Sequence, residues 1–387
     1  MARLTLLALL LLAAPARAWD NHRALTALAV RDLPALDASV TVETLDSFLA
    51  ATNRPGGTAA FLKEHKLNPQ AALPWLLNES AGQTVTLRAV VAGYADEPDW
   101  GIDQDLFAAY PELWKENYKY MGGRTGTQTR AFRHMFWPQG FYKEPLPGGK
   151  LPIHDATPLG EAPDRAQVFF DLSKAAFQSG HPYWGARFLS WSLHYYQDLT
   201  MPFHAVQLPS TDFLQFKPDG SLDLELTTRW VIYAHLCLDA FPARAASGSL
   251  GPDSGAGVVA ALAGRAVQPI VSARALSVAA ANTSAAQSRR SGLDTLEFFP
   301  EPDGDTLKDP LGVTQDAGFW TALAKQITAD PAAGKKFTSL ATDLLSASGP
   351  AIRGLVMAAM APPRVNAINL QPAAARVQHA LALPLPR

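Results

Sequence analysis

This chain has very little cysteine, little charge, and no hydrophobic run long enough to cross a membrane. Cys237 is the only cysteine, so no disulfide can form within the chain. Charged residues make up 18% and the formal net charge is −2, so there is no basic excess of the kind that meets duplex nucleic acid. No segment reaches the roughly 18 uninterrupted apolar residues of a membrane helix. These absences exclude a disulfide scaffold and make a duplex-DNA binder and a membrane-spanning protein poor interpretations.

Apolar residues are abundant, and they recur with helical periodicity. Hydrophobic residues make up 48% of 387 residues, which is enough to bury a large core. No segment shows the alternating apolar and polar pattern of a β domain, and no internal repeat is present. The sequence therefore predicts an all-α fold.

The N-terminus has the form of a secretory signal. Arg3 precedes a leucine-rich run over 4–13, and small residues surround Arg17 up to Ala18. Cleavage after Ala18 would place the protein in the periplasm or outside the cell. It would also free the α-amine of Trp19, which is a good nitrogen donor for zinc once deprotonated.

Prolines and glycines divide the remaining chain into helical and irregular stretches. The expected helical segments are 21–33, 86–96, 165–200, 224–241, 258–284, 317–329 and 334–361. The expected irregular segments are 138–164 and 242–257. The predicted domain organisation is a signal peptide over 1–18, one domain over 19–361 and a Pro/Ala-rich tail over 362–387.

Histidine and aspartate recur at spacings that suit a metal site. His194 and Asp198 are four residues apart, so a helix places them on one face. Pro202 then interrupts the helix, which lets His204 project in another direction. His235 and Asp239 repeat the four-residue spacing on a second predicted helix. Imidazole and carboxylate together are ligands that zinc accepts.

Further candidates lie upstream, and each has an ordinary interpretation beside the metal-binding one. His134 stands among aromatic residues, where a hydrogen-bonded core histidine is common. Asp96 opens an acidic stretch, 96–105, that would usually be a solvated loop. Taken alone, a His/Asp pair four apart is more often a surface pair, and Cys237 is best explained by packing. One metal cluster accounts for the whole set at once.

The order and spacing of these residues resemble the exported zinc-dependent phospholipases C and the related single-strand-specific zinc nucleases. The segment LHYYQDLTMPFHA, residues 193–205, is similar to the central motif of that superfamily. YADEPD, residues 94–99, resembles the segment that supplies an upstream aspartate, and RHMFWP, residues 133–138, the one that supplies the next histidine. The resemblance is strongest over 19–241, and it leaves 258–361 as a helical extension of unassigned role.

The resemblance implies three zinc ions in an all-α domain, with the cluster between core helices. The implied ligands of the first ion are Asp96, His134, His194 and Asp198. The second ion would use Trp19 and His22 and share Asp198 as a bridge, and the third would use His204, His235 and Asp239. Asp96 and Asp198 are the implied catalytic carboxylates.

The function that this resemblance implies is hydrolysis of the glycerol-side phosphodiester of a phospholipid by a zinc-bound hydroxide. Phospholipid, or another phosphodiester, would be the substrate, with transient contact to a membrane surface. Duplex nucleic acid and an obligate protein partner are not expected. Two alternatives stay open: a single-strand-specific nuclease or nucleotidase, whose aromatic residues would stack on bases, and a non-catalytic scaffold stabilised by zinc.

Overall fold

A computed structural model describes residues 21–69, 79–103, 106, 110, 133–146, 150–155, 157–251 and 254–362. These residues are mostly helical, as the sequence predicts, and the helices surround a long buried helix, α9 (Pro182–Asp198). Every side chain of α9 from Tyr183 to Asp198 is buried. Apolar and aromatic residues lie on all sides of this helix, with a few buried polar residues among them, which is the pattern of a helix enclosed by other elements.

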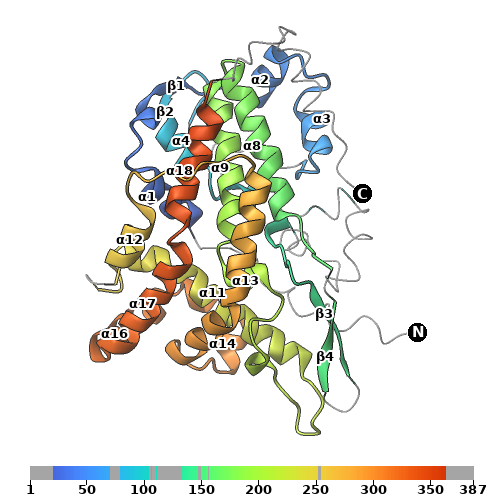
Figure 1. Ribbon diagram of the computed structural model, residues 1–387, viewed down its shortest axis with the longest axis vertical. Coiled ribbons are helices and arrows are strands. Elements are labelled where there is room, and N and C mark those ends of the chain that lie inside the picture. The colour runs from blue at the N-terminus through green and yellow to red at the C-terminus, as the bar shows by residue number, and fades with distance from the viewer. Residues whose placement is uncertain are drawn as a thin grey trace.

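Four long helices run side by side through the centre of the molecule (Figure 1). They are α8 (Ala162–Gln178), α9, α13 (Ala273–Phe298) and α18 (Ser348–Met360). The turn between α8 and α9 depends on Gly180, whose φ of 83° is in the left-handed region that favours glycine. This tight turn brings α9 back along α8, and Gly185 lets the Phe177 ring approach the α9 backbone closely.

The other elements cover the ends and sides of this group. The N-terminal part contributes α1 (His22–Val30), α2 (Leu45–Ala51), α3 (Gly57–Glu64) and α4 (Leu87–Gly93), with short turns at Pro34–Asp37 and Pro98–Ile102. After α9 come α10 (Pro202–Ala205), a turn at Thr211–Phe213, α11 (Leu224–Ala246), α12 (Ala256–Leu262), α14 (Gly304–Lys308), α15 (Pro310–Gln315), α16 (Ala317–Ala329) and α17 (Pro331–Leu345). No helix among the described residues has the length and hydropathy needed to cross a membrane.

Among the residues that the structure describes there are two short antiparallel sheets that the sequence did not indicate. One joins β1 (Ser39–Thr41) to β2 (Thr84–Thr86). The other joins β3 (Phe141–Leu146) to β4 (Lys150–Asp155) and lies inside the segment expected to be irregular. Its pairing includes register shifts, and these irregularities break the alternation that would reveal a strand in the sequence.

The prediction of a loop from Pro242 to residue 257 is wrong for its first part. Helix α11 continues through Pro242 to Ala246. A proline inside a helix removes one backbone hydrogen bond. Here Phe241 and Ala245, one turn apart, are both fully buried, and their burial offsets that cost.

The C-terminal helices complete the core. Helix α18 packs against α1, α8 and α9, and Ile352, Leu355 and Val356 are fully buried. The Arg353 guanidinium donates to the backbone carbonyl of Ala29 at 3.0 Å. This contact ties the end of α1 to α18, so the helical extension helps to hold the N-terminal helix in place.

Candidate metal centre

The centre of the site is the C-terminal half of α9. His194 and Asp198 are fully buried, and His194 Nε2 lies 3.5 Å from Asp198 Oδ2. The next turn of chain ends α9, and Pro202 starts the short helix α10 that carries His204. The predicted spacing therefore places two side chains on one helical face and a third on a separate element, as expected from the interruption.

Helix α1 brings His22 to the same carboxylate. Asn21 caps this helix, because its side-chain oxygen accepts a hydrogen bond from the Ala24 amide at 2.9 Å. His22 is the first residue of the helix and is fully buried, and its Nε2 lies 3.4 Å from Asp198 Oδ1. A contact across 176 residues of sequence is thus made by the N-terminal helix.

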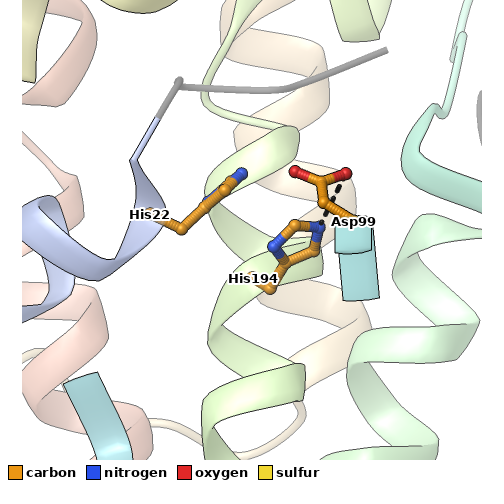
Figure 2. A group of neighbouring side chains, drawn as sticks. All are labelled: His22, Asp99 and His194. Atoms are coloured by element: carbon orange, nitrogen blue, oxygen red, sulfur yellow. Dashed lines mark ion pairs between the residues drawn. The ribbon is translucent and has the colours of Figure 1, made fainter. Parts of the chain in front are cut away.

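His134 and Asp99 complete the cluster. His134 Nδ1 lies 2.9 Å from Asp198 Oδ2 and 2.8 Å from His194 Nε2. Asp99 Oδ1 lies 3.7 Å from His134 Nδ1 and 3.9 Å from His194 Nε2. Figure 2 shows Asp99 facing His194, with His22 on the other side of the imidazole.

Two overlapping groups in this cluster could hold a metal ion. One consists of His22, Asp99 and His194, and the other of His134, His194 and Asp198. Within each group the potential ligand atoms lie within 4.8 Å of one another, and all the side chains are buried. Imidazole nitrogens and carboxylate oxygens that converge in this way are donors that a metal ion can accept.

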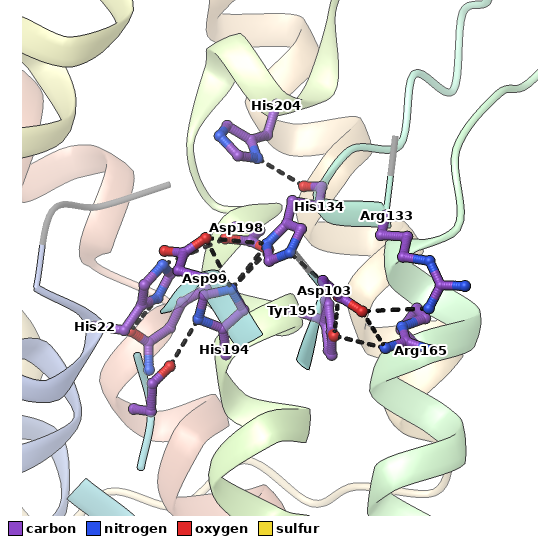
Figure 3. Close-up of polar contacts among 12 residues, drawn as sticks. His22, Asp99, Asp103, Arg133, His134, Arg165, His194, Tyr195, Asp198 and His204 are labelled. Atoms are coloured by element: carbon purple, nitrogen blue, oxygen red, sulfur yellow. Dashed lines mark hydrogen bonds and ion pairs between the residues drawn. The ribbon is translucent and has the colours of Figure 1, made fainter. Parts of the chain in front are cut away.

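In His134, His194 and His204 the ring nitrogen that points away from the cluster lies beside an oxygen atom, as Figure 3 shows. His194 Nδ1 donates to the Ala95 carbonyl at 2.7 Å, and His204 Nδ1 donates to the His134 carbonyl at 2.6 Å. His134 Nε2 lies 3.3 Å from Asp103 Oδ2. A partner on one ring nitrogen fixes the tautomer and leaves the other nitrogen available to a metal.

A second pair of histidines lies beyond this cluster. His204 Nε2 and His235 Nε2 are 3.0 Å apart, with the two rings perpendicular. His235 and Asp239 are buried on α11, one turn apart. The residues expected to form a third metal position therefore come from α10 and α11.

Three carboxylates of the acidic segment, those of Glu97, Asp99 and Asp103, are buried rather than solvated, in contrast to the ordinary interpretation of such a run, and Asp96 is partly buried. Asp96 Oδ1 accepts a hydrogen bond from the Arg23 backbone amide at 3.1 Å, so this carboxylate lies at the first turn of α1. Asp99, which the sequence did not single out, is the carboxylate of this segment that approaches the nitrogens His134 Nδ1 and His194 Nε2, which face the cluster. Its only sequence signal is its place three residues after Asp96 in the same acidic run.

Two further carboxylates of this segment, those of Glu97 and Asp103, are held by buried cations. Arg187 Nε donates to Glu97 Oε2 at 2.9 Å, and Trp191 Nε1 donates to the same oxygen at 2.7 Å. Arg165 donates to Asp103 Oδ1 at 2.8 Å, and Arg133 donates to it at 3.2 Å. These pairs fix the backbone on both sides of Asp99.

The charges of the cluster are coupled. Burial opposes ionisation of His134, but the Asp198 and Asp103 carboxylates outweigh it and raise the pKa of His134 to about 9. Burial likewise favours the neutral acid at Asp198, yet His194 and His134 hold its pKa well below the usual range. Without a metal, His134 is therefore an imidazolium between two carboxylates, in the place that a bound cation would take.

We expect metal binding here to weaken as the pH falls below about 9, because a cation at His134 Nδ1 must displace a proton. One displaced proton gives roughly a tenfold loss of affinity per pH unit. Zinc titration against a competing chelator between pH 6.5 and 8.5 measures this slope. In the metal-free protein the raised pKa stabilises the fold below pH 6.5, and this contribution is lost as the pH rises through 9. A zinc affinity that does not change with pH would contradict the presence of this proton on His134.

Trp19, the remaining predicted ligand, lies outside the described residues. No protein-family model matches the chain, and no curated protein or solved structure matches it. The function is therefore argued from the chemistry of the site and from the sequence resemblance.

Proposed function

We propose that this protein is a zinc-dependent phosphodiester hydrolase of the phospholipase C type. The observation that carries the proposal is the buried meeting of His22, His134 and His194 on the Asp198 carboxylate. Three imidazoles around one ionised carboxylate fit closely spaced zinc positions that share that carboxylate. The resemblance of residues 193–205 to the zinc phospholipase and nuclease motif gives the same interpretation independently.

The resemblance implies three ions, and we assign the proposed ligands to them in the same way. His134, His194 and Asp198 would hold one, with a carboxylate from the acidic segment, where Asp99 is nearest and Asp96 is the residue that matches the motif. His22 and Asp198 would hold a second with the amine of Trp19, and His204, His235 and Asp239 a third. Histidine nitrogen and carboxylate oxygen are the ordinary ligands of zinc.

Zinc, Asp198 and Asp96 each have a distinct part in the proposed reaction. Bound zinc supplies positive charge at the phosphate and lowers the pKa of an attacking water. Asp198, ionised and buried, keeps the metal positions adjacent. The Asp96 carboxylate orients the water and accepts its proton, and it remains the second proposed catalytic residue. The low-dielectric surroundings strengthen all of these interactions in the transition state.

A phospholipid is the proposed substrate because the chain has no basic excess with which to attract a polyanion. The net charge of −2 suits a zwitterionic head group better than a nucleic acid strand. Export after cleavage following Ala18, and transient contact with a membrane surface, belong to the same proposal.

Protein beginning at Trp19, incubated with phosphatidylcholine vesicles, should release diacylglycerol and phosphocholine. A chelator should abolish release, and added zinc should restore it, because the chemistry depends on the metal. Single-stranded DNA is assayed in parallel. Chelator-sensitive cleavage of DNA alone would place the protein with the nucleases, and bound zinc with no turnover on either substrate would favour the scaffold alternative.

A further inference from the structure

Gln197 connects the N-terminal helix to the central helix inside the core. It precedes Asp198 on α9 and is 1% exposed. His22 Nδ1 donates to Gln197 Oε1 at 3.1 Å, and Gln197 Nε2 donates to Thr26 Oγ1 at 2.6 Å. His22 and Thr26 are one turn apart on α1, so a single amide contacts the same face of that helix twice.

The contact decides which nitrogen of His22 faces the cluster. With the proton of Nδ1 directed to the amide oxygen, Nε2 is the nitrogen that faces the cluster, 3.4 Å from Asp198 Oδ1. That nitrogen is fully buried and has no hydrogen-bond partner of its own. A neutral imidazole whose remote N–H is already bound to an acceptor is prepared to ligate a metal.

The position of α1 depends on separate contacts at its two ends. At its C-terminal end, Arg353 of α18 donates to the Ala29 carbonyl. At its N-terminal end, the Gln197 amide holds His22 and Thr26. Loss of the amide would therefore release the ring of His22 while α1 stays attached through α18.

We propose that Gln197 is a positioning residue that fixes the tautomer and orientation of His22, and so builds one metal position independently of the others. His134, His194 and His204 have different acceptors, namely Asp103, the Ala95 carbonyl and the His134 carbonyl. The inference rests on the proposed zinc function and concerns only the position that includes His22.

Gln197→Met keeps the length of the side chain and removes its hydrogen bonds to His22 and Thr26. We expect zinc affinity at one position to fall 10–100-fold, which is the usual effect of losing the hydrogen-bond acceptor of a histidine that ligates a metal. At a buffered free-zinc concentration between the affinities of wild type and variant, elemental analysis should find one equivalent fewer per chain. His22→Ala, which removes the ligand itself, should show the same deficit.

Gln197→Glu is the matched control, because a carboxylate still accepts the proton of His22 Nδ1. It should retain the full complement of zinc, whereas a merely structural role for the amide would not predict rescue by a buried charge. Thr26→Val, which removes only the hydroxyl, should reduce affinity less than Gln197→Met. Thermal unfolding of each variant shows whether it folds.

The outcomes separate this inference from the proposed function. Wild-type protein that binds no zinc would overturn both. Wild-type protein that binds zinc, together with a Gln197→Met variant of unchanged stoichiometry and affinity, would overturn the role of Gln197 alone. If Gln197→Met does not fold, loss of zinc from a folded Gln197→Glu variant would also overturn the role of Gln197.

Discussion

Asp198→Asn should lower turnover on the phosphodiester substrate by at least about 10³-fold. Three histidines approach this carboxylate, and its position suits it to bridge two metal ions. An amide has no negative charge to hold two cations together, and a loss of about 4 kcal/mol of transition-state stabilisation corresponds to this factor. Initial rates under saturating zinc measure the effect, and elemental analysis should find less bound metal.

The matched control is Asp305→Asn. Asp305 is an exposed residue of α14 that pairs with Lys308 at the surface. The substitution therefore converts the same carboxylate to an amide away from the cluster. Its turnover should equal that of the wild type. Unchanged turnover in Asp198→Asn would eliminate a mechanism that depends on a shared carboxylate.

Arg187→Met should destabilise the fold by about 3–5 kcal/mol, the usual effect of removing one partner from a buried ion pair. The Arg187 and Glu97 side chains are almost completely inaccessible to solvent, and the guanidinium lies 4.1 Å from the centre of the Tyr94 ring. The substitution leaves the Glu97 carboxylate buried with only the indole of Trp191 among the donors described above. Chemical denaturation measures the loss.

Two variants show whether burial is the cause. Arg229→Met removes the cation of an exposed pair with Glu225 on α11 and should leave the unfolding midpoint unchanged. The double change Arg187→Met with Glu97→Leu removes both charges and should recover part of the lost stability. Equal effects of Arg187→Met and Arg229→Met would show that the buried pair has no special importance.

Most of the helices could be predicted because their apolar residues follow the helical period. Helix α16 has the bounds expected from the sequence, and the expected segment 165–200 is present as α8 and α9 with a turn at Gly180. The pairing of β3 with β4 was missed because its register shifts do not fit the regular two-residue period by which a strand is recognised in a sequence. The continuation of α11 through Pro242 was missed because tertiary burial overrode a local helix breaker.

Much of the candidate site could also be anticipated. The His194, Asp198 and His204 spacing is local and follows from one helix and its interruption, and the resemblance indicated His22 and His134. Asp99 could not be distinguished from its acidic neighbours, because a run of carboxylates does not show which member faces inward. The buried pairs of Glu97 and Asp103 with arginines far away in sequence decide that orientation.

The sequence by itself determined the helical class and the kinds of side chain available for a metal, because periodicity and spacing act within one element. Only the tertiary structure decided which carboxylate approaches the histidines and which acceptor fixes each ring. Those choices depend on contacts between elements distant in the chain, such as Gln197 with His22 and Asp103 with His134. In a buried cluster most polar groups need such a partner, and the packing of the helices supplies it for the histidine nitrogens that point away from the cluster.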